Sequence, residues 1–191
     1  MIGGSDVTSF KITTRDMVLI SMFAALIAVG AFIKIPIGPV PVTLQFMFVL
    51  LAGQVLKLKS AVITLIIYTV MGLLGLPVFS GGGGLSYIVT PTFGYIVGFV
   101  FAVLVVSLIS HNGKITFLKL LSANFLGFIV VYVFGIGYYI LLSHFYFDTL
   151  LDFGVVLMTG FVAFIPTDIA FCILTAVISK RLRPILTKRM A

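Results

Sequence analysis

Charged residues are scarce in this chain, and tryptophan and glutamate are absent. Only 9% of the 191 residues are charged, whereas a soluble domain carries about 25% charged residues. Hydrophobic residues make up 61% of the chain. A soluble fold of this size needs more polar groups to cover its surface. The composition therefore argues against a water-soluble enzyme and against a nucleic-acid-binding protein, and no nucleic-acid partner is expected.

Motifs that would identify an enzyme are missing as well. The chain has no Walker-type P-loop, because Gly113-Lys114 lacks the upstream glycine and the following hydroxyl residue. The single cysteine, Cys172, cannot form an internal disulfide. No cluster of His, Cys, Asp and Glu has metal-ligand spacing, and no nucleophile is paired with a base. We therefore expect a binding or transport protein rather than an enzyme, with no metal site and no cofactor.

Long apolar runs dominate what is present. They suit membrane-spanning helices of about 20 residues and not the alternating strands of an outer-membrane barrel. The fold class predicted is an all-α membrane protein with six transmembrane helices. The predicted spans are 17–33, 42–56, 61–76, 87–110, 117–142 and 153–179. We expect residues 1–16 to form a cytoplasmic tail, 17–184 a single transmembrane domain in the lipid bilayer, and 185–191 a cytoplasmic basic tail.

The distribution of positive charge predicts the orientation. If the N-terminus is inside, all of the 12 Lys and Arg residues except Lys34 fall on inside segments. Cytoplasmic loops retain Lys and Arg, so the pattern predicts an N-in, C-in multi-pass protein of the cytoplasmic membrane. The net charge of +7 then reflects topology. The first run has a second interpretation as a cleaved signal peptide, because Ala28-x-Gly30 is a small-x-small triplet that follows Lys11 and Arg15.

Asp168 and Lys34 are the two candidate charged residues for a ligand. Asp168 is the only acidic residue within an apolar run, about 16 Å from the inner end of the last span at 1.5 Å per residue. An ionisable group at that depth is costly and indicates function. Alternatively, Asp168 caps a helix that restarts after Pro166. Lys34 either attracts a substrate carboxylate or extends to the outer headgroups.

Uncharged polar residues add further candidates. Thr43 and Gln45 enter the second span just after Pro41, and a glutamine in an apolar run needs a partner on another helix or on a ligand. Asn124 is expected to form hydrogen bonds between helices. Tyrosines near the outer end, such as Tyr87, serve as interfacial anchors or stack on a substrate ring.

Two clusters of small residues have alternative interpretations. The four consecutive glycines 81–84 form either a lid or pocket wall, or a plain connector. Ala24, Ala28 and Gly30 with Ala31 give the first span a small-residue face that another helix can approach closely. That helix belongs either to this chain or to a separate subunit.

Several segments resemble the BioY family, the biotin-specific S components of energy-coupling factor (ECF) transporters. The most specific is Ile35-Pro-Ile-Gly-Pro-Val-Pro-Val-Thr-Leu-Gln45. Further similar segments are 48–53, 72–80 with the glycine run, 91–95, Asn124-x-x-Gly127 with Tyr132 and Gly135, and Pro166-x-Asp168. The resemblance spans residues 17–184.

The resemblance implies an S-component-like bundle that captures biotin with high affinity and imports it. A transmembrane coupling subunit and two ATP-hydrolysing subunits would be its partners, which accounts for the missing P-loop. The substrate-binding residues it implies are Asp168, Lys34, Thr43, Gln45, Tyr87, Thr92, Tyr95 and Tyr132. The lid residues are Gly81, Gly82, Gly83 and Gly84, and the contact with a partner subunit uses Ala24, Ala28 and Ala31. The alternatives are a solitary biotin facilitator and an S component for a different small vitamin.

Two positions depart from the family pattern. Phe171 stands where the family often has lysine, three residues after the aspartate. Phe93 stands where the family has the first glycine of Pro-Thr-Gly-Gly. Our hypothesis is that Lys34 supplies the positive charge that the family's lysine would supply at position 171. Asp168 would accept hydrogen bonds from the ureido N–H groups of biotin.

Overall fold

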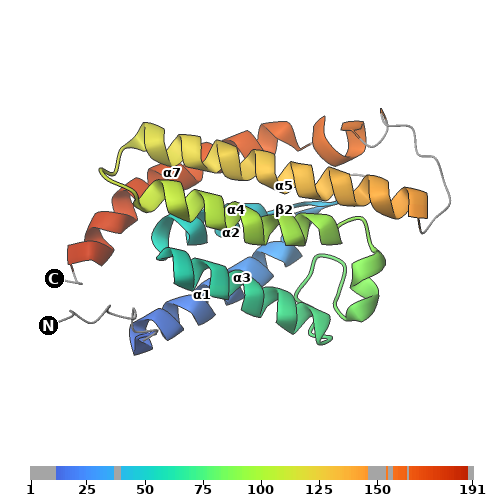
Figure 1. Cartoon of the computed structure of the whole chain (residues 1–191), viewed down its shortest axis with the longest axis horizontal. Coiled ribbons are helices and arrows are strands. Elements are labelled where there is room, and N and C mark those ends of the chain that lie inside the picture. The colour runs from blue at the N-terminus through green and yellow to red at the C-terminus, as the bar shows by residue number, and fades with distance from the viewer. Residues whose placement is uncertain (1–11, 37–39, 146–153, 155–156, 163, 189–191) are drawn as a thin grey trace, which may run out of the picture.

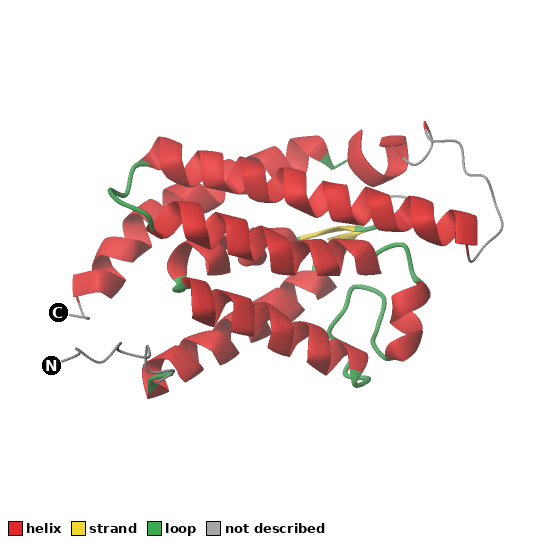
Figure 2. Ribbon diagram, viewed as in Figure 1, coloured by secondary structure: helices red, strands yellow, loops and turns green. Residues whose placement is uncertain are grey.

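The computed structural model describes residues 12–36, 40–145, 154, 157–162 and 164–188, which are mostly helical (Figures 1 and 2). In chain order the elements are α1 (Thr14–Phe32), β1 (Lys34–Ile35), β2 (Val42–Thr43), α2 (Gln45–Val55), α3 (Leu58–Leu73), the 3-10 helix η1 (Leu85–Val89), α4 (Phe93–His111), α5 (Phe117–Phe145), the π-helical turn η2 (Met158–Val162) and α7 (Ile165–Lys188). The two strands pair antiparallel, with Lys34 opposite Thr43.

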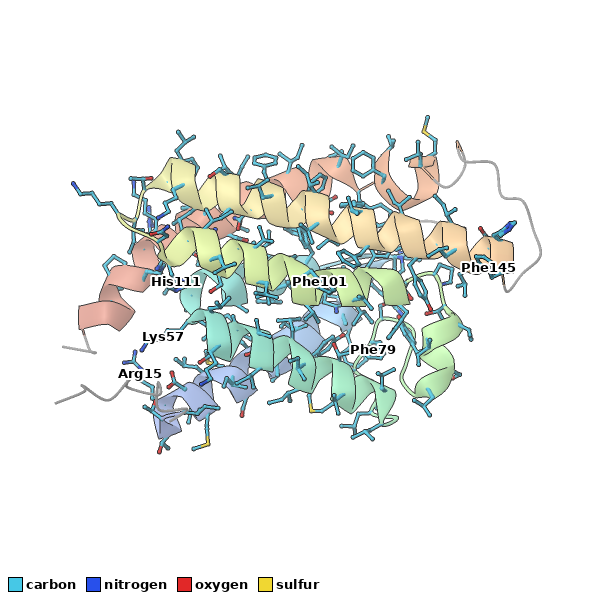
Figure 3. All side chains as sticks on the ribbon, viewed as in Figure 1. Arg15, Lys57, Phe79, Phe101, His111 and Phe145 are labelled. Carbon is cyan, nitrogen blue, oxygen red and sulfur yellow. The ribbon has the colours of Figure 1, made fainter. Side chains whose placement is uncertain are left out.

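Successive helices run back and forth along the long axis of the molecule. As a result α1 begins and α7 ends at the same end (Figure 1). Arg15, Lys57 and His111 lie at that end, which we call the basic end, whereas Phe79 and Phe145 lie at the opposite one (Figure 3). We call the latter the glycine-loop end, because Phe79 directly precedes the loop with the four glycines.

Local sequence explains where the first and last helices begin. The Thr13 hydroxyl accepts the Asp16 N–H (3.2 Å), and the Asp16 carboxylate accepts the Thr13 N–H (3.1 Å). This capping box satisfies two N–H groups that a helix start otherwise leaves unpaired. Pro166 is the second residue of α7, where its missing N–H costs nothing. The restart expected near Pro166 is therefore present, and Asp168 lies in the first turn.

The short helix α2 occupies the centre of the bundle. It packs against α1, α4 and α7, and Val49, Leu50 and Ala52 are completely buried. Beside it, α4 and α5 pack against each other along their length. At Gly98 an added Cβ would lie 3.0 Å from the Val131 Cα, so only glycine permits this close approach.

A buried hydrogen-bond network ties three helices together near the basic end. The Gln54 amide of α2 donates to the Asn124 side chain of α5 (2.7 Å) and to the Leu120 carbonyl (2.8 Å). The Asn124 amide in turn donates to the Cys172 carbonyl of α7 (2.8 Å). The predicted role of Asn124 in joining helices is confirmed.

Four segments among the described residues are long and apolar enough to cross a membrane. They are Thr14–Phe32, Phe93–His111, Phe117–Phe145 and Gly160–Ile185. The other two expected spans correspond to the apolar but shorter helices α2 and α3. With 11 residues, α2 is about 16 Å long, roughly half of the hydrocarbon thickness.

Two expected spans begin later than the hydropathy indicated. The fourth span begins at Phe93, and the residues expected to open it form η1 instead. Thr90 has extended backbone angles (φ −107°, ψ 146°), as expected before Pro91, and this conformation ends η1. The last span divides into η2 and α7.

Parts of the predicted segments lie outside the described residues. They include positions 1–11 of the expected N-terminal tail, positions 37–39 of the proline-rich segment, position 153 and residues 189–191 of the expected basic tail. Helix α7 continues to Lys188, beyond the boundary expected at residue 184.

The small-residue face of α1 is directed mainly into the chain itself. Ala24 and Ala31 are buried, with 3% and 0% of their surface exposed, and Ala28 is partly buried. An added Cβ at Gly30 would lie 2.9 Å from the Gln45 backbone nitrogen, so the helix that approaches α1 closely at this point is α2. The methyl groups of Ala24 and Ala31 are thus covered by the chain itself, and the expected contact of this face with a partner subunit stays a prediction.

Candidate functional site

A cavity lies toward the glycine-loop end, lined by residues from six elements. The lining residues are Val40, Pro41, Thr43, Gln45, Phe46, Ser80, Tyr87, Thr92, Tyr95, Ile96, Phe99, Val131, Tyr132, Phe164 and Asp168. The structure thus brings seven of the eight predicted substrate-binding residues to one cavity, and the eighth, Lys34, lies outside it.

The Asp168 carboxyl group is buried in this wall and has one protein partner. Only 6% of the residue is exposed, and the Tyr132 hydroxyl donates a hydrogen bond to Oδ2 (2.5 Å). Within the described part of the chain, Oδ1 has no hydrogen-bond donor. None of the cavity-lining residues is Lys, Arg or His. The carboxyl group therefore retains an acceptor atom for an N–H group of a ligand.

Two tyrosine rings form a rigid aromatic corner next to Asp168. The rings of Tyr95 and Tyr132 meet edge to face, with centroids 5.8 Å apart and an interplanar angle of 89°. The Tyr95 hydroxyl donates to the Gly160 carbonyl of η2 (2.8 Å). Gly135 leaves the space for Tyr95, since an added Cβ would lie 2.5 Å from its ring. Each ring is thus fixed by packing and by a hydrogen bond before any ligand enters.

Gln45 is positioned by a buried tyrosine that the sequence interpretation missed. Its amide nitrogen donates to the Tyr68 hydroxyl (2.9 Å), which donates to the Val78 carbonyl (2.9 Å). Tyr68 is completely buried in α3. The only sign of this role in the sequence was the position of Tyr68 in the middle of an apolar run. The chain of bonds links α2 and α3 to the start of the glycine loop.

The glycine loop is anchored on the end of α3. At Gly72 an added Cβ would lie 2.0 Å from the Phe79 ring, which is 1% exposed, so the ring covers the glycine. At Gly83 an added Cβ would lie 2.1 Å from the Leu76 carbonyl oxygen. Gly82 and Gly84 adopt left-handed φ angles of 121° and 102° that favour glycine. These contacts favour the interpretation of glycines 81–84 as part of a pocket wall over that of a plain connector.

Tyr87 joins the two sides of this wall. Its hydroxyl accepts a hydrogen bond from Thr92 (2.9 Å) and forms another with the Ser80 hydroxyl (3.1 Å). The Thr90 hydroxyl donates to the Tyr87 carbonyl (2.6 Å). We call the segment from Ser80 to Thr92 the roof. It covers one side of the cavity, and whether it moves as a lid stays a prediction.

Lys34 lines a second cavity that adjoins the first. The second cavity shares Pro41, Ser80, Tyr87 and Thr92 with the first. The Lys34 ammonium group donates a hydrogen bond to the Ser80 carbonyl. The expected cation therefore lines the adjoining cavity and not the one that contains Asp168.

Most of the cavity-lining residues that the sequence did not predict are apolar. Neither Phe93 nor Phe171, the two departures from the family pattern, lines the cavity. Phe46, Ile96, Phe99 and Phe164 line it without any signal in a chain that is apolar throughout. The Phe93 ring instead packs against Tyr138, with centroids 5.8 Å apart. Phe171 is partly buried against the core and does not line the cavity. Among the described residues, no group of three or more His, Cys, Asp and Glu side chains could hold a metal ion.

Comparison with known proteins identifies close relatives. The model of the BioY family matches residues 6–188. The probable biotin transporter BioY of Lysinibacillus sphaericus is 40% identical over 171 residues, which cover 89% of this chain and 87% of that protein. The biotin transporter BioY of Thermotoga maritima is 35% identical over 176 residues, or 92% and 99% of the two chains.

A solved structure has the same fold. It is a crystal structure of the S-component for biotin from an ECF-type ABC transporter. It matches with a TM-score of 0.79 and 27% sequence identity, and the match covers 91% of this chain and 95% of that one.

Proposed function

The chain belongs to the BioY family, and we propose on that basis that it is the substrate-binding S component of an ECF-type transporter for biotin. The observation that carries this proposal is the convergence of Thr43, Gln45, Tyr95, Tyr132 and Asp168 on one cavity. Biotin has a fused ring system, a ureido group and a carboxylate tail. A site for it needs aromatic walls, a hydrogen-bond acceptor for N–H groups, and a cation.

The ureido group is placed against Asp168 in this proposal. Oδ1 of the carboxylate accepts one ureido N–H, while Tyr132 occupies Oδ2. Gln45, held by Tyr68, lies on the same wall and offers its amide oxygen. A hydrogen bond to a charged group contributes about 1.5–3 kcal/mol. The rings of the ligand pack in the corner formed by Tyr95 and Tyr132.

The carboxylate tail points toward Lys34. The cavity around Asp168 has no cation in its lining, and the adjoining cavity contains Lys34. The tail passes beneath Tyr87, which borders both spaces, and its carboxylate replaces the Ser80 carbonyl as the partner of the ammonium group. This arrangement keeps the charged tail near the outer surface, where desolvation costs less than in the apolar interior.

Six membrane crossings with both termini in the cytoplasm complete the proposal. The cations Arg15 and Lys57 lie at the basic end, where α1 begins and α7 ends (Figure 3). Cytoplasmic segments retain Lys and Arg, so the basic end faces the cytoplasm and the cavity faces outward. Energy comes from two ATP-hydrolysing subunits through a coupling subunit, because this chain carries no P-loop.

Isothermal titration of the purified Asp168→Asn variant with biotin tests the assignment. The amide keeps the shape of the carboxyl group but turns one acceptor into a donor that faces the ureido N–H. We expect Kd to rise about 10- to 150-fold, the equivalent of one hydrogen bond to a charged group. Asp16→Asn makes the same chemical change at the basic end and should leave Kd unchanged. Wild-type affinity for Asp168→Asn would refute the proposed site.

A further inference from the structure

The amide group of Gln45 has two chemically opposite ends, and only one of them can face a ligand. The oxygen Oε1 accepts hydrogen bonds, whereas the nitrogen Nε2 donates them. Gln45 is the first residue of α2 and lines the cavity that contains Asp168, with 4% of its surface exposed. The orientation of this amide therefore decides whether the cavity wall presents an acceptor or a donor at this point.

The hydroxyl group of Tyr68 decides between the two orientations. A tyrosine hydroxyl has one proton to donate, and Tyr68 donates it to the Val78 carbonyl (2.9 Å), which can only accept. Toward Gln45 the same hydroxyl can then act only as an acceptor, so it must meet the amide nitrogen (2.9 Å). With the amide turned, either two acceptor oxygens would face each other or the Val78 carbonyl would lose its donor.

Tyr68 acts on the cavity through Gln45 and not by contact with a ligand. It is completely buried in α3 and does not line the cavity. Its ring packs against the ring of Phe79, with centroids 5.5 Å apart and an interplanar angle of 73°. The ring is thus held by packing and the hydroxyl by the Val78 carbonyl, so the partner of the amide nitrogen is already in place before a ligand enters.

The result is a second open acceptor in the cavity, in addition to the Asp168 carboxylate. Within the described part of the chain, no hydrogen-bond donor reaches Gln45 Oε1 or Asp168 Oδ1. Neither oxygen is among the buried side-chain atoms of those residues that are sealed off without a partner. Helices α2 and α7, which carry the two residues, pack against each other. A ligand that pairs with both oxygens must therefore offer two donor groups.

We propose that Tyr68 is a positioning residue that makes the cavity selective for a cyclic urea with both of its N–H groups intact. One N–H group of the ligand meets Asp168 Oδ1, and the other meets Gln45 Oε1. A ligand in which either nitrogen is alkylated leaves one acceptor unpaired, and this lowers its affinity. The inference rests on the proposed function, because it takes biotin as the ligand of this cavity.

Isothermal titration of the purified full chain with biotin and its two N-methyl isomers, each methylated at one ureido nitrogen, tests the assignment. In the wild type each isomer should bind about tenfold more weakly than biotin. In Tyr68→Phe the amide is free to turn, so biotin should lose about tenfold in affinity, while the isomer methylated at the nitrogen that faces Gln45 loses none. The other isomer keeps its penalty relative to biotin. Tyr138→Phe is the matched control, because it removes a hydroxyl that donates to the Ile88 carbonyl of the roof, and both penalties should persist.

Gln45→Ala separates positioning from a merely structural role. It removes the amide, so it should abolish the penalty of the same isomer, and adding Tyr68→Phe should change that penalty no further. The proposal is overturned if the wild type binds either isomer as well as biotin, if Tyr68→Phe keeps both penalties or lowers both equally, or if Gln45→Ala keeps both. The result for Gln45→Ala decides even where Tyr68→Phe does not fold. A wild type that does not bind biotin at all would instead overturn the proposed function.

Discussion

Gly135 offers a sharp test of how the aromatic corner is built. An added Cβ would lie 2.5, 2.6 and 2.7 Å from three atoms of the Tyr95 ring, whereas carbon atoms in contact prefer about 3.5–4.0 Å. In a Gly135→Ala variant the Tyr95 ring must therefore move by about 1 Å. The ring is only 8% exposed, and its hydroxyl is bonded to Gly160 (2.8 Å). A displacement therefore disturbs the packing, the hydrogen bond and the cavity wall.

The expected magnitude follows from these contacts. Overpacking a core costs about 1–3 kcal/mol, and replacing a helical glycine by alanine returns about 0.5–1 kcal/mol. The net loss of stability is then about 0–2.5 kcal/mol. Biotin should bind about tenfold more weakly, because a displaced wall and a weakened hydrogen bond together cost about 1.4 kcal/mol.

Gly137→Ala provides the matched control on the same helix. An added Cβ there has nothing within 4 Å, so this variant should gain about 0.5–1 kcal/mol and bind biotin like the wild type. Thermal unfolding in detergent measures stability, and isothermal titration measures affinity. If Gly135→Ala matches Gly137→Ala in both measurements, the corner is not as rigid as its contacts indicate and the reasoning is wrong.

Three further changes test the tail site, the helix network and the orientation. Lys34→Ala should lose most of its preference for biotin over biotinamide, as measured by titration, because the amide lacks the charge that Lys34 attracts. Asn124→Ala should destabilise the fold by about 1–3 kcal/mol in thermal unfolding, because it leaves buried groups unpaired. The control Ser122→Ala, which removes an exposed bond, should change stability little. In intact cells, a Ser86→Cys variant should react with an impermeant maleimide, and Lys114→Cys should react only after lysis.

Each of these expectations has a contradicting outcome. An unchanged preference for biotin in Lys34→Ala would show that Lys34 does not bind the substrate carboxylate and only holds Ser80. Equal stability of Asn124→Ala and Ser122→Ala would show that the buried network contributes no net free energy. Labelling of Lys114→Cys in intact cells would contradict the proposed orientation, in which Lys114 lies on the cytoplasmic side.

Polar residues in apolar runs were the part of the site that the sequence could predict. Thr43, Gln45 and Asp168 stand out against their surroundings, because burying such groups is costly unless they have partners or a ligand. The apolar walls could not be predicted in the same way. Phe99 lines the cavity with 6% of its surface exposed, while Phe101 on the same helix is 44% exposed. In a membrane protein both the lipid-facing and the core-facing sides are apolar, so hydropathy does not separate them.

Hydropathy also could not predict where a helix ends within an apolar run, or which helices approach each other. Pro91 ends η1 before α4 begins, yet the residues on both sides of it are apolar enough to read as one span. The small residues of α1 posed a related problem. Spacing predicts that another helix approaches, but it does not say which one, and the structure assigns Gly30 to α2 of the same chain.

The bonds of the roof also bear on how long a captured molecule stays. Tyr87 holds Ser80 and Thr92 together, and Lys34 holds Ser80 from the other side. The two Tyr87 bonds involve no ligand atom, so if the roof opens as a lid, the barrier that they impose slows arrival and departure by the same factor and leaves the equilibrium unchanged. Residence time is then governed by the frequency of a protein-internal event. A partner subunit that loosens these few bonds would speed unloading without weakening any contact to the cargo.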